Sequence, residues 1–421
     1  MQSMRVDKQG NTKMRKIGIV GAGQAGLQLG LGLLKNGYQV VITSNQTPDQ
    51  IRNGRVTSSQ CMFDRALENE RALGIDFWKD APPVEGIQFS LVPGGQTAMQ
   101  WSSRLDRPAQ SIDQRVKMPR WMTEFEKAGG ELRIADVDMA GLEALEQECD
   151  LVIVASGKGE IGKLFQRDET RSPFDKPQRS LALTYVHGME PRKEHSAVNF
   201  NLMPGVGEYF VFPALTLSGP CEIMVFEGIP GGPMDNWANV KSAQEHLAES
   251  LRILKEFVPE EYARSKDCVL TDDLGILAGR FPPTVRKPVL ALPNGAVALG
   301  MGDSVCLNDP ITGQGSNNAS HCAAAYLTAI LEHGDRPYDA AFMQATFDRY
   351  WDYAQFVVGW TNNMLLPPPE HMVKILGTAQ QNQKVAHWFV NGFNDPRTYF
   401  PTITDPALTD AFLAEAMGAA A

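Results

Sequence analysis

The sequence predicts an α/β protein with three regions, and one observation supports each region. Near the amino end, an apolar strand, a glycine-rich turn, an apolar helix and a second strand follow one another over residues 17–43. Short apolar strands separated by Gly and Pro turns occupy residues 180–226, which is typical of an antiparallel sheet. From residue 338 the pattern is mostly helical. We therefore expect a Rossmann-like domain, an inserted antiparallel β-sheet and a helical carboxyl-terminal region.

The amino-terminal unit carries a dinucleotide-binding fingerprint. Gly21 allows a tight turn after the strand, Gly23 lets the backbone approach a pyrophosphate, and Gly26 lets the helix pack closely on the strand. Ala22 and Ala25 lie between these glycines, and the amino terminus of the helix offers free N–H groups to the phosphates. A glycine-rich turn without a ligand is the alternative. The strand on each side of the helix argues against it.

This unit does not say which dinucleotide binds. In NAD sites, and often in FAD sites, an Asp or Glu at the end of the second strand accepts a hydrogen bond from the ribose. Here the strand ends in Thr43, Ser44 and Asn45, with no acid. Ser44 or Asn45 would bind more weakly, so the adenosine end of the site stays open. Arg55, a little further on, is either a solvated charge or a contact to phosphate or flavin.

Composition and charge exclude several classes of protein. The chain has 421 residues, a formal net charge of −10, 43% apolar and 21% charged residues. Such an acidic chain is a poor partner for nucleic acid or an anionic membrane, and no apolar run approaches the roughly 20 residues of a membrane span. Residues 1–13 lack the apolar core of a secretion signal, so we expect a disordered tail and a cytoplasmic protein. The cysteines and histidines show no paired spacing, which argues against disulfides and a metal site.

A second glycine pattern follows a buried strand in the middle of the chain. We expect strands at 86–92, 98–101, 131–137 and 149–157, and a helix at 119–128. Gly157 to Gly162 then match G-x-G-x-x-G again. The continuation turns polar within a few residues and meets Pro173, which leaves no room for a full helix. We interpret this segment as a loop after a strand and not as a second nucleotide site.

A further motif lies far downstream. An apolar strand ends in Gly302-Asp303, and the Asp303 carboxylate is expected to accept hydrogen bonds from ribitol or ribose hydroxyls. After a loop, Pro310, Gly313 and Gly315 lead into an Ala-rich helix. The amino terminus of that helix is expected to face the electron-rich edge of an isoalloxazine ring. The alternative is an ordinary strand–loop–helix without a ligand. The dinucleotide-binding fingerprint at the amino end argues against that alternative.

These motifs, with residues 172–179, 309–320 and 360–362, resemble the flavoprotein monooxygenases of the para-hydroxybenzoate hydroxylase fold. The chain is similar over nearly its whole length to the styrene and indole monooxygenases. The resemblance implies a two-component enzyme that binds FAD, lacks an NAD(P)H site and receives reduced FAD from an NADH-dependent flavin reductase. Reduced flavin would react with O2, and the hydroperoxyflavin would epoxidise a small aromatic alkene. The substrate is then styrene or indole, and indole oxide leads on to indigo.

The resemblance also implies site residues. The cofactor-binding residues are then Gly21, Ala22, Gly23, Ala25, Gly26, Ser44, Arg55, Arg115, Asp303, Pro310, Gly313 and Gly315. The Ser-x-Gln-x-Met pattern of residues 58–62 looks like the indole branch, since the styrene branch resembles Asn-x-Val-x-His there. Residues expected to shape the substrate pocket or its flavin side are Ser58, Gln60, Met62, Val84, Ile87 and Ala109. No general acid or base is assigned, because the cofactor carries the hard step.

The expected domains are discontinuous. The FAD-binding domain comprises residues 14–85, 108–178 and 280–345. The substrate domain comprises residues 86–107 and 179–279, and residues 346–421 form the carboxyl-terminal helical region. The main rival function is a single-component aromatic hydroxylase that takes electrons directly from NAD(P)H. Rivals of other classes are a non-catalytic flavin- or nucleotide-binding regulator and an amine-oxidase-like fold that uses bound FAD as acceptor. The sequence is also compatible with a homodimer.

Overall fold

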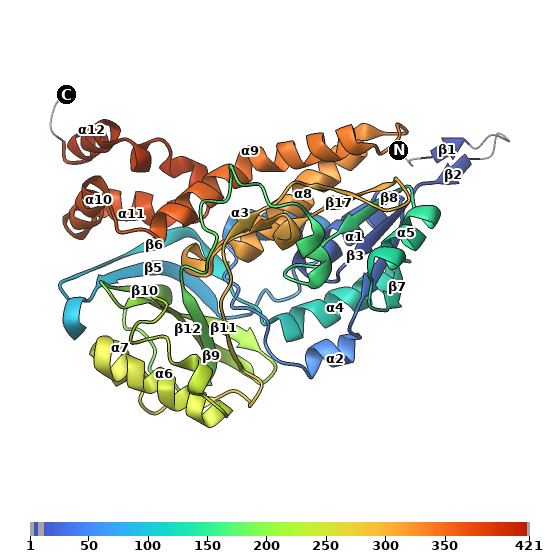
Figure 1. Cartoon of the computed structure of the whole chain (residues 1–421). Helices are drawn as coiled ribbons and strands as arrows, with labels where there is room; N and C mark the ends of the chain where they lie inside the picture. The colour runs from blue at the N-terminus through green and yellow to red at the C-terminus, as the bar shows by residue number, and fades with distance from the viewer. Residues whose placement is uncertain (1–3, 7–11, 419–421) are drawn as a thin grey trace.

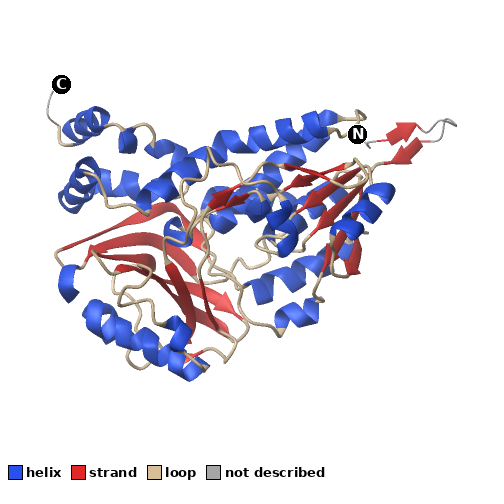
Figure 2. Cartoon of the chain, viewed as in Figure 1, coloured by secondary structure: helices blue, strands red, loops and turns tan. Residues whose placement is uncertain are grey.

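The computed structural model describes residues 4–6 and 12–418, which form two large sheets and a group of carboxyl-terminal helices (Figures 1 and 2). The short strands β1 (Met4–Val6) and β2 (Thr12–Met14) pair antiparallel at the amino end. The rest of the tail expected at residues 1–13 lies outside the described residues. No helix in the described part of the chain combines the length and apolar character needed to cross a membrane.

The first sheet belongs to the nucleotide-binding part and has the strand order β16-β17-β8-β3-β4-β7. Its strands are β3 (Lys16–Val20), β4 (Gln39–Ser44), β7 (Glu131–Ile134), β8 (Leu151–Val154), β16 (Val289–Ala291) and β17 (Val297–Gly300). All neighbours pair in parallel except the hairpin of β16 and β17. Every residue of β8 is buried, as expected for a central parallel strand covered on both faces.

Helices cover this sheet and link it to the rest of the chain (Figure 1). They are α1 (Gln24–Lys35), α2 (Pro48–Arg52), α3 (Asp64–Leu73), α4 (Gln114–Lys127), α5 (Met139–Glu148) and α8 (Gly315–His333). α1 packs closely on α8, and a Cβ at Gly32 would lie only 2.6 Å from the Leu327 side chain. This close contact brings the helix of the first motif against the helix of the last one.

The second sheet has eight strands, in the order β13-β9-β12-β11-β10-β5-β6, with β14 also paired to β9. They are β5 (Pro83–Leu91), β6 (Met99–Gln110), β9 (Ser180–His187), β10 (Ala197–Met203), β11 (Gly207–Thr216), β12 (Gly219–Gly228), β13 (Val269–Leu270) and β14 (Ile276–Gly279). All pairs are antiparallel except β5 with β10, which is parallel. The inserted sheet is thus extended by a hairpin from earlier in the chain.

Helices enclose the second sheet from both sides (Figure 1). α6 (Ala243–Phe257) and α7 (Pro259–Ser265) cover one face. On the other face lie α9 (Ala340–Met364), α10 (Glu370–Gln381), α11 (Gln383–Gly392) and α12 (Pro406–Ala416). α9 spans both parts, because Tyr350 packs in the core of the first sheet and Trp360 in the core of the second.

Short elements make the connections. The paired strands β15 (Thr284–Val285) and β18 (Cys306–Leu307) are two residues long each. The 3-10 helices are η1 (Pro93–Gly95), η2 (Glu160–Leu164), η3 (Trp237–Asn239), η4 (Gly302–Ser304), η5 (Pro310–Thr312), η6 (Pro396–Tyr399) and η7 (Thr402–Thr404). Two of them, η4 and η5, belong to the downstream motif.

Candidate functional site

The glycine-rich turn joins the end of β3 to the start of α1. Gly21 has a φ of +118° and donates its N–H to the carbonyl oxygen of Thr43 at 2.8 Å. A Cβ at Gly21 would lie 2.3 Å from the carbonyl oxygen of Ala155, and a Cβ at Gly26 only 2.0 Å from that of Gly21. A Cβ at Gly23 would meet no atom within 4 Å. The turn therefore needs two glycines for its own shape and leaves the third open toward a ligand.

The downstream Gly-Asp motif lies directly against this turn. A Cβ at Gly302, whose φ is +59°, would lie 3.3 Å from the Cβ of Ala25. The neighbouring Asp303 side chain has no hydrogen-bond or ion-pair partner among the described residues. Desolvation raises the pKa of Asp303, and the charges of Lys158 and Arg286 oppose that rise. A partly desolvated carboxylate without a donor is suited to accept hydrogen bonds from sugar hydroxyls.

The segment of residues 309–315, which we call the flavin loop, leads into α8. Asp309 accepts a hydrogen bond from the N–H of Ile311 at 3.1 Å and so begins η5. Gly313 has a φ of +64°, and a Cβ at Gly313 or Gly315 would meet no atom within 4 Å. α8 has no side-chain cap at its amino terminus. The free N–H groups of α8 and two open glycines therefore stand together, which suits a ring that carries negative charge.

Buried polar atoms without a partner cluster on the same elements. They are Ser156 Oγ, Ser304 Oγ, Gln314 Oε1 and Asn318 Oδ1. Buried polar atoms in folded proteins are nearly always hydrogen-bonded. A polar ligand that runs from the glycine-rich turn past η4 to the start of α8 would supply such partners. With the open glycines and the free carboxylate, these residues fit FAD.

Ser44 and Arg55 stand near the expected adenosine end. Ser44 ends β4, and its hydroxyl donates to the carbonyl oxygen of Gln46 at 2.8 Å. Arg55 follows α2, is exposed, and has no hydrogen bond or ion pair among the described residues. The Arg55 guanidinium is thus free to bind a phosphate. The Ser44 hydroxyl already donates its proton to the carbonyl oxygen of Gln46.

Arg115 is buried and fully engaged within the protein. Its guanidinium donates to Asp113 at 2.9 Å, to both oxygens of Asp272 at 2.9 and 3.0 Å, and to Thr216 at 3.2 Å. A longer bond of 3.5 Å reaches the carbonyl oxygen of Gly54. These bonds occupy all five guanidinium donors. The geometry favours a role in fixing the residue before Arg55, and a direct contact of Arg115 with FAD stays a prediction.

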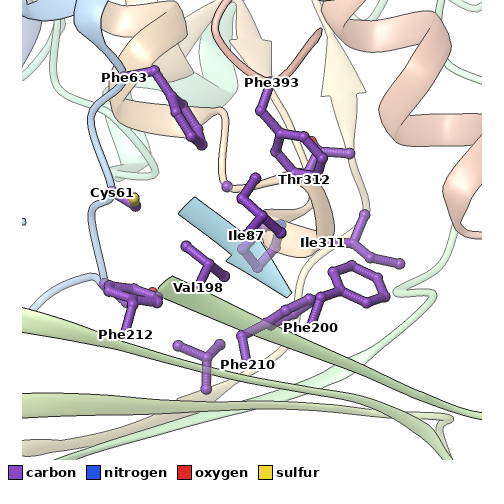
Figure 3. A pocket seen from close by; sticks show the side chains of 14 residues that line it. Cys61, Phe63, Ile87, Val198, Phe200, Phe210, Phe212, Ile311, Thr312 and Phe393 are labelled. Atoms are coloured by element: carbon purple, nitrogen blue, oxygen red, sulfur yellow. The ribbon is translucent and has the colours of Figure 1, made fainter. Parts of the chain in front are cut away.

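A small apolar cavity of about 40 Å³ lies between the flavin loop and the second sheet (Figure 3). It is lined by Ser59, Cys61, Phe63, Ile87, Val198, Phe200, Phe210, Phe212, Val225, Pro310, Ile311, Thr312, Gly313 and Phe393. Ser59 and Thr312 are the only side chains in this lining that carry a hydroxyl. The lining is therefore almost wholly apolar, which keeps the space beside the flavin loop dry.

Of the six residues expected to shape the substrate pocket, Ile87 lines this cavity. The segment 58–63 forms no helix or strand and pairs with Gln110 only at Met62, and its odd-numbered residues Ser59, Cys61 and Phe63 line the cavity. Sequence reasoning missed these three residues. The signal for them was present, because side chains alternate between two faces along an extended chain.

The other five expected residues lie outside the lining of this cavity. Ser58 donates to the amide oxygen of Gln60 at 2.8 Å, and the Gln60 amide donates to the carbonyl oxygen of Ile112. Met62 packs in a separate small cluster with residues of α3. Val84 and Ala109 are paired across β5 and β6 and are buried. Their contribution to the pocket or to its flavin side stays a prediction.

A much larger cavity of about 1050 Å³ adjoins the small one. Ile87, Phe200 and Phe393 line both. The larger cavity lies between β5, β10 and β11 of the second sheet and the α9–α10 region, and its lining includes Trp360, Met364, Leu365, Pro367, Pro368 and Pro369. Small-molecule sites commonly have roughly 300–1,000 Å³. The larger cavity therefore has the room for an aromatic substrate that the smaller one lacks.

Comparison with known proteins finds relatives that match most of the length of the chain. The family model of the styrene monooxygenase A putative substrate binding domain matches residues 157–264. The styrene monooxygenase StyA of Pseudomonas fluorescens is 31% identical over 404 residues, which cover 93% of this chain and 96% of that protein. The chain belongs to the styrene monooxygenase family. A second family member, StyA of Pseudomonas sp, is 30% identical over the same share of both chains.

Solved structures of flavin-dependent enzymes share the fold of this family member. The flavin-dependent brominase Bmp2 superposes with a TM-score of 0.67 at 13% identity, over 96% of this chain and 99% of the brominase. The flavin-dependent halogenase CmlS has a TM-score of 0.63 at 17% identity, over 96% of this chain and 77% of its own. The α/β prediction with a Rossmann-like domain is confirmed. Family membership and fold together make the chain a flavin-dependent monooxygenase.

Proposed function

We propose that the chain is the oxygenase component of a two-component flavin monooxygenase. It takes reduced FAD from an NADH-dependent flavin reductase and uses O2 to epoxidise a small aromatic alkene. Indole is the favoured substrate, and styrene is the alternative. The observation that carries this proposal is the contact of the glycine-rich turn with Gly302, next to Asp303 and followed by a flavin loop that lines an apolar cavity.

The second glycine pattern supports a separate reductase. Residues 157–162 lead into η2, a 3-10 helix of five residues, and not into a helix of nucleotide-binding length. In the part of the chain that the structure describes, the glycine pattern opens an α-helix only at residues 21–26. A single-component hydroxylase that oxidises NAD(P)H directly would need to place a second nucleotide elsewhere.

The residues proposed to hold FAD divide by the part of the cofactor they meet. The phosphates would be bound by Gly21, Ala22, Gly23, Ala25, Gly26 and Arg55. Arg115 would support these residues from the protein side. The sugar hydroxyls fall to Asp303 and the adenosine end to Ser44. Pro310, Gly313 and Gly315 face the isoalloxazine. Exposed glycine backbone and the amino termini of α1 and α8 support this division.

The chemistry asks the side chains to bind, orient and exclude water. When bound, reduced FAD would supply the two electrons that split O2, so that one oxygen atom goes to the epoxide and the other leaves as water, while the alkene brings its own electron pair. The chain holds the alkene where the larger cavity adjoins the small one beside the flavin loop. The aromatic side chains proposed to keep water from this place are Phe63, Phe200, Phe210, Phe212 and Phe393. The larger cavity supplies the route and the room for the substrate.

Conversion of indole to blue indigo tests the proposal. We expect colour under air when the protein is mixed with indole, NADH, FAD and a flavin reductase. Without the reductase we expect neither colour nor NADH oxidation. Rapid NADH oxidation by the chain alone would support the single-component rival. Failure to oxidise indole and styrene in the complete mixture would overturn the proposal.

The choice of indole over styrene rests on residues 58–62. The Ser58–Gln60–Ile112 hydrogen-bond chain fixes the Gln60 amide in one orientation. We expect the combined change Ser58→Asn, Gln60→Val and Met62→His to shift the ratio of kcat/KM toward styrene by about tenfold, or about 1.4 kcal/mol. The exposed Thr57, changed to Ser, is the control. An unchanged ratio in the triple variant would remove this segment from substrate choice.

A further inference from the structure

A pair of buried carboxyl groups lies behind the flavin loop. Glu227, at the end of β12, and Asp309, at the start of the loop, are both 0% exposed. Neither Glu227 oxygen has a hydrogen-bond partner, and the same holds for Asp309 Oδ2. The other oxygen of Asp309 accepts the Ile311 N–H that begins η5. Three carboxyl oxygens are thus buried with no donor from any other described residue, and the Glu227 and Asp309 side chains are close enough to hydrogen-bond each other.

The charged groups around the pair favour a proton bound between the two carboxyl groups. Asp309, Glu208 and Arg179 act on Glu227, and Lys158 acts on Asp309. Arg179 is already engaged, because it donates to both oxygens of Glu208 at 2.7 and 2.9 Å. Desolvation and the neighbouring carboxylates raise the pKa of Glu227 well above its usual value. Since ionised carboxyl groups only accept hydrogen bonds, two of them in contact must share a proton.

The position of the pair ties this proton to the cofactor site. Asp309 immediately precedes Pro310, and residues 310–313 line the small cavity. A neutral Glu227 can donate to Asp309 Oδ2, which leaves the other oxygen free to hold Ile311. An ionised Glu227 would instead repel Asp309 in a medium of low dielectric and pull the start of the loop out of place.

We propose that Glu227 is a positioning residue of the flavin loop, which stays protonated at neutral pH and donates a hydrogen bond to Asp309. The pair thereby holds residues 309–315 in the shape that receives the isoalloxazine. This inference rests on the proposed function, since it assumes that FAD binds at this loop. It adds a residue of the second sheet to a cofactor site otherwise built from the first.

Titration of the full-length, flavin-free chain with FAD at pH 7 tests the role of the pair. Glu227→Ala leaves Asp309 unpaired, and we expect FAD to bind about tenfold more weakly. Glu227→Gln keeps a donor of similar size, and we expect affinity within about twofold of the wild type. Glu222→Gln is the control. Glu222 lies on the same strand and its pKa is raised to about 7 by desolvation, and the charges that act on it are those of Arg264, Glu261 and Arg192, all outside the loop.

Infrared spectroscopy of the same proteins gives a readout that packing alone would not move. We expect the carbonyl band of a protonated carboxylic acid in the wild type at pH 7, retained in Glu222→Gln at least in part and reduced in Glu227→Gln. Equal FAD affinity in the wild type and Glu227→Ala would overturn the inference, as would Glu227→Gln binding as weakly as Glu227→Ala. An unchanged band in Glu227→Gln would do the same.

The failure of the inference can be told apart from the failure of the proposed function. A wild-type chain that binds no FAD removes the proposed function itself. A wild-type chain that binds FAD, with variants that bind equally well, leaves the function standing and removes Glu227 from the site. Thermal melting of each variant shows that it is folded, and Glu227→Gln keeps the test sharp if Glu227→Ala does not fold.

Discussion

The chain carries the same glycine pattern twice, at neighbouring strands of one sheet, and only the first copy opens an α-helix. β3 and β8 pair in parallel, so residues 21–26 and 157–162 emerge at the same edge. The first copy leads into the 12 residues of α1, and the second into the five residues of η2. The turns are alike, since the last glycine of each packs on the carbonyl oxygen of the first. Glycine spacing therefore specifies a turn, and the residues after it decide whether a nucleotide site follows.

The sequence after each turn explains the difference. In α1, Leu27 and Leu29 are fully buried, so the helix has an apolar surface to bury against the sheet and α8. After Gly162, Lys163 is exposed and Leu164 is 47% exposed. A short helix gains most of its stability from packing, and the second segment buries only Ile161 and Phe165 on either side of its exposed residues. Single-residue changes in the two copies and at Asp303 beside them follow, from the largest expected effect to the smallest.

Gly26→Ala should have the largest effect. The new Cβ would lie 2.0 Å from the carbonyl oxygen of Gly21, which is backbone and cannot move aside. We expect a loss of about 1–3 kcal/mol in the free energy of unfolding. FAD affinity should fall by about 100-fold, or about 2.8 kcal/mol. Chemical denaturation and FAD titration measure the two.

Gly162→Ala is the matched change in the second copy. Its Cβ would lie 2.7 Å from the carbonyl oxygen of Gly157, so stability should also fall. Most of the FAD affinity should remain, because this turn does not carry the pyrophosphate. Equal losses of FAD affinity in the two variants would contradict the distinction between the copies.

Gly23→Ala should separate binding from folding. Its Cβ would meet no protein atom within 4 Å, so the free energy of unfolding should stay within about 0.5 kcal/mol of the wild type. FAD affinity should fall by about tenfold, because the methyl group would stand where we propose that the pyrophosphate approaches. In the second copy, Gly159→Ala should change FAD affinity by less than about twofold. A Gly23→Ala chain that binds FAD normally would place the phosphates elsewhere.

Much of the fold was predictable because local pattern decides it. The spacing of apolar residues and the positions of turn residues predict three features. These are the glycine turn, the buried strand before Gly157 and the antiparallel strands of 180–226. The strand expected at 98–101 runs on to Gln110, because an edge strand with one exposed face can be rich in polar residues. The helix expected from Pro119 begins at Gln114, where the Asp113 side chain caps it. The prediction places the start of the helix at Pro119 because proline is common in the first turn, whereas this proline lies inside the helix.

The site was harder to predict than the fold. An alternating pattern shows that residues 58–63 have two faces, but it cannot say which face meets the cavity. The structure turns Cys61 toward the cavity and ties Gln60 to a backbone carbonyl. Glu227 and Asp309 are far apart in the sequence, and only the packing of the two sheets brings them together. Such contacts depend on tertiary structure that no local pattern records.

Asp303→Asn should weaken FAD binding without weakening the fold. Loss of the charged acceptor should lower affinity by about tenfold at pH 7. Because desolvation raises the pKa of Asp303, its stabilising contribution is present below its ordinary pKa and is lost as the pH rises through the raised value. Asp303→Asn should therefore be at least as stable as the wild type at pH 7.

The pH dependence of FAD binding checks the same carboxylate. In the wild type, affinity should fall on acidification as Asp303 takes up a proton, and the fall should begin above the range usual for Asp. In Asp303→Asn this fall in affinity at low pH, the acid limb of the profile, should be absent. An identical acid limb in both proteins would assign it to another group.

Lys158→Ala should have the smallest effect and asks whether the second copy takes any part in the site. Lys158 is exposed, its Nζ lies 4.1 Å from the centre of the Phe281 ring, and its charge acts on Asp303. We expect a loss of about 0.5–1 kcal/mol in the free energy of unfolding and a further rise in the pKa of Asp303. The acid limb of FAD binding should therefore move to higher pH.

Lys163→Ala is the control for this change. Lys163 lies in the same segment and pairs with Glu160 at 2.5 Å on the surface, so its removal should leave the acid limb in place. A shift in Lys158→Ala alone would mean that the second copy contributes a charge to the site opened by the first. Equal profiles in the two variants would mean that the second glycine turn serves only to connect β8 to the rest of the chain.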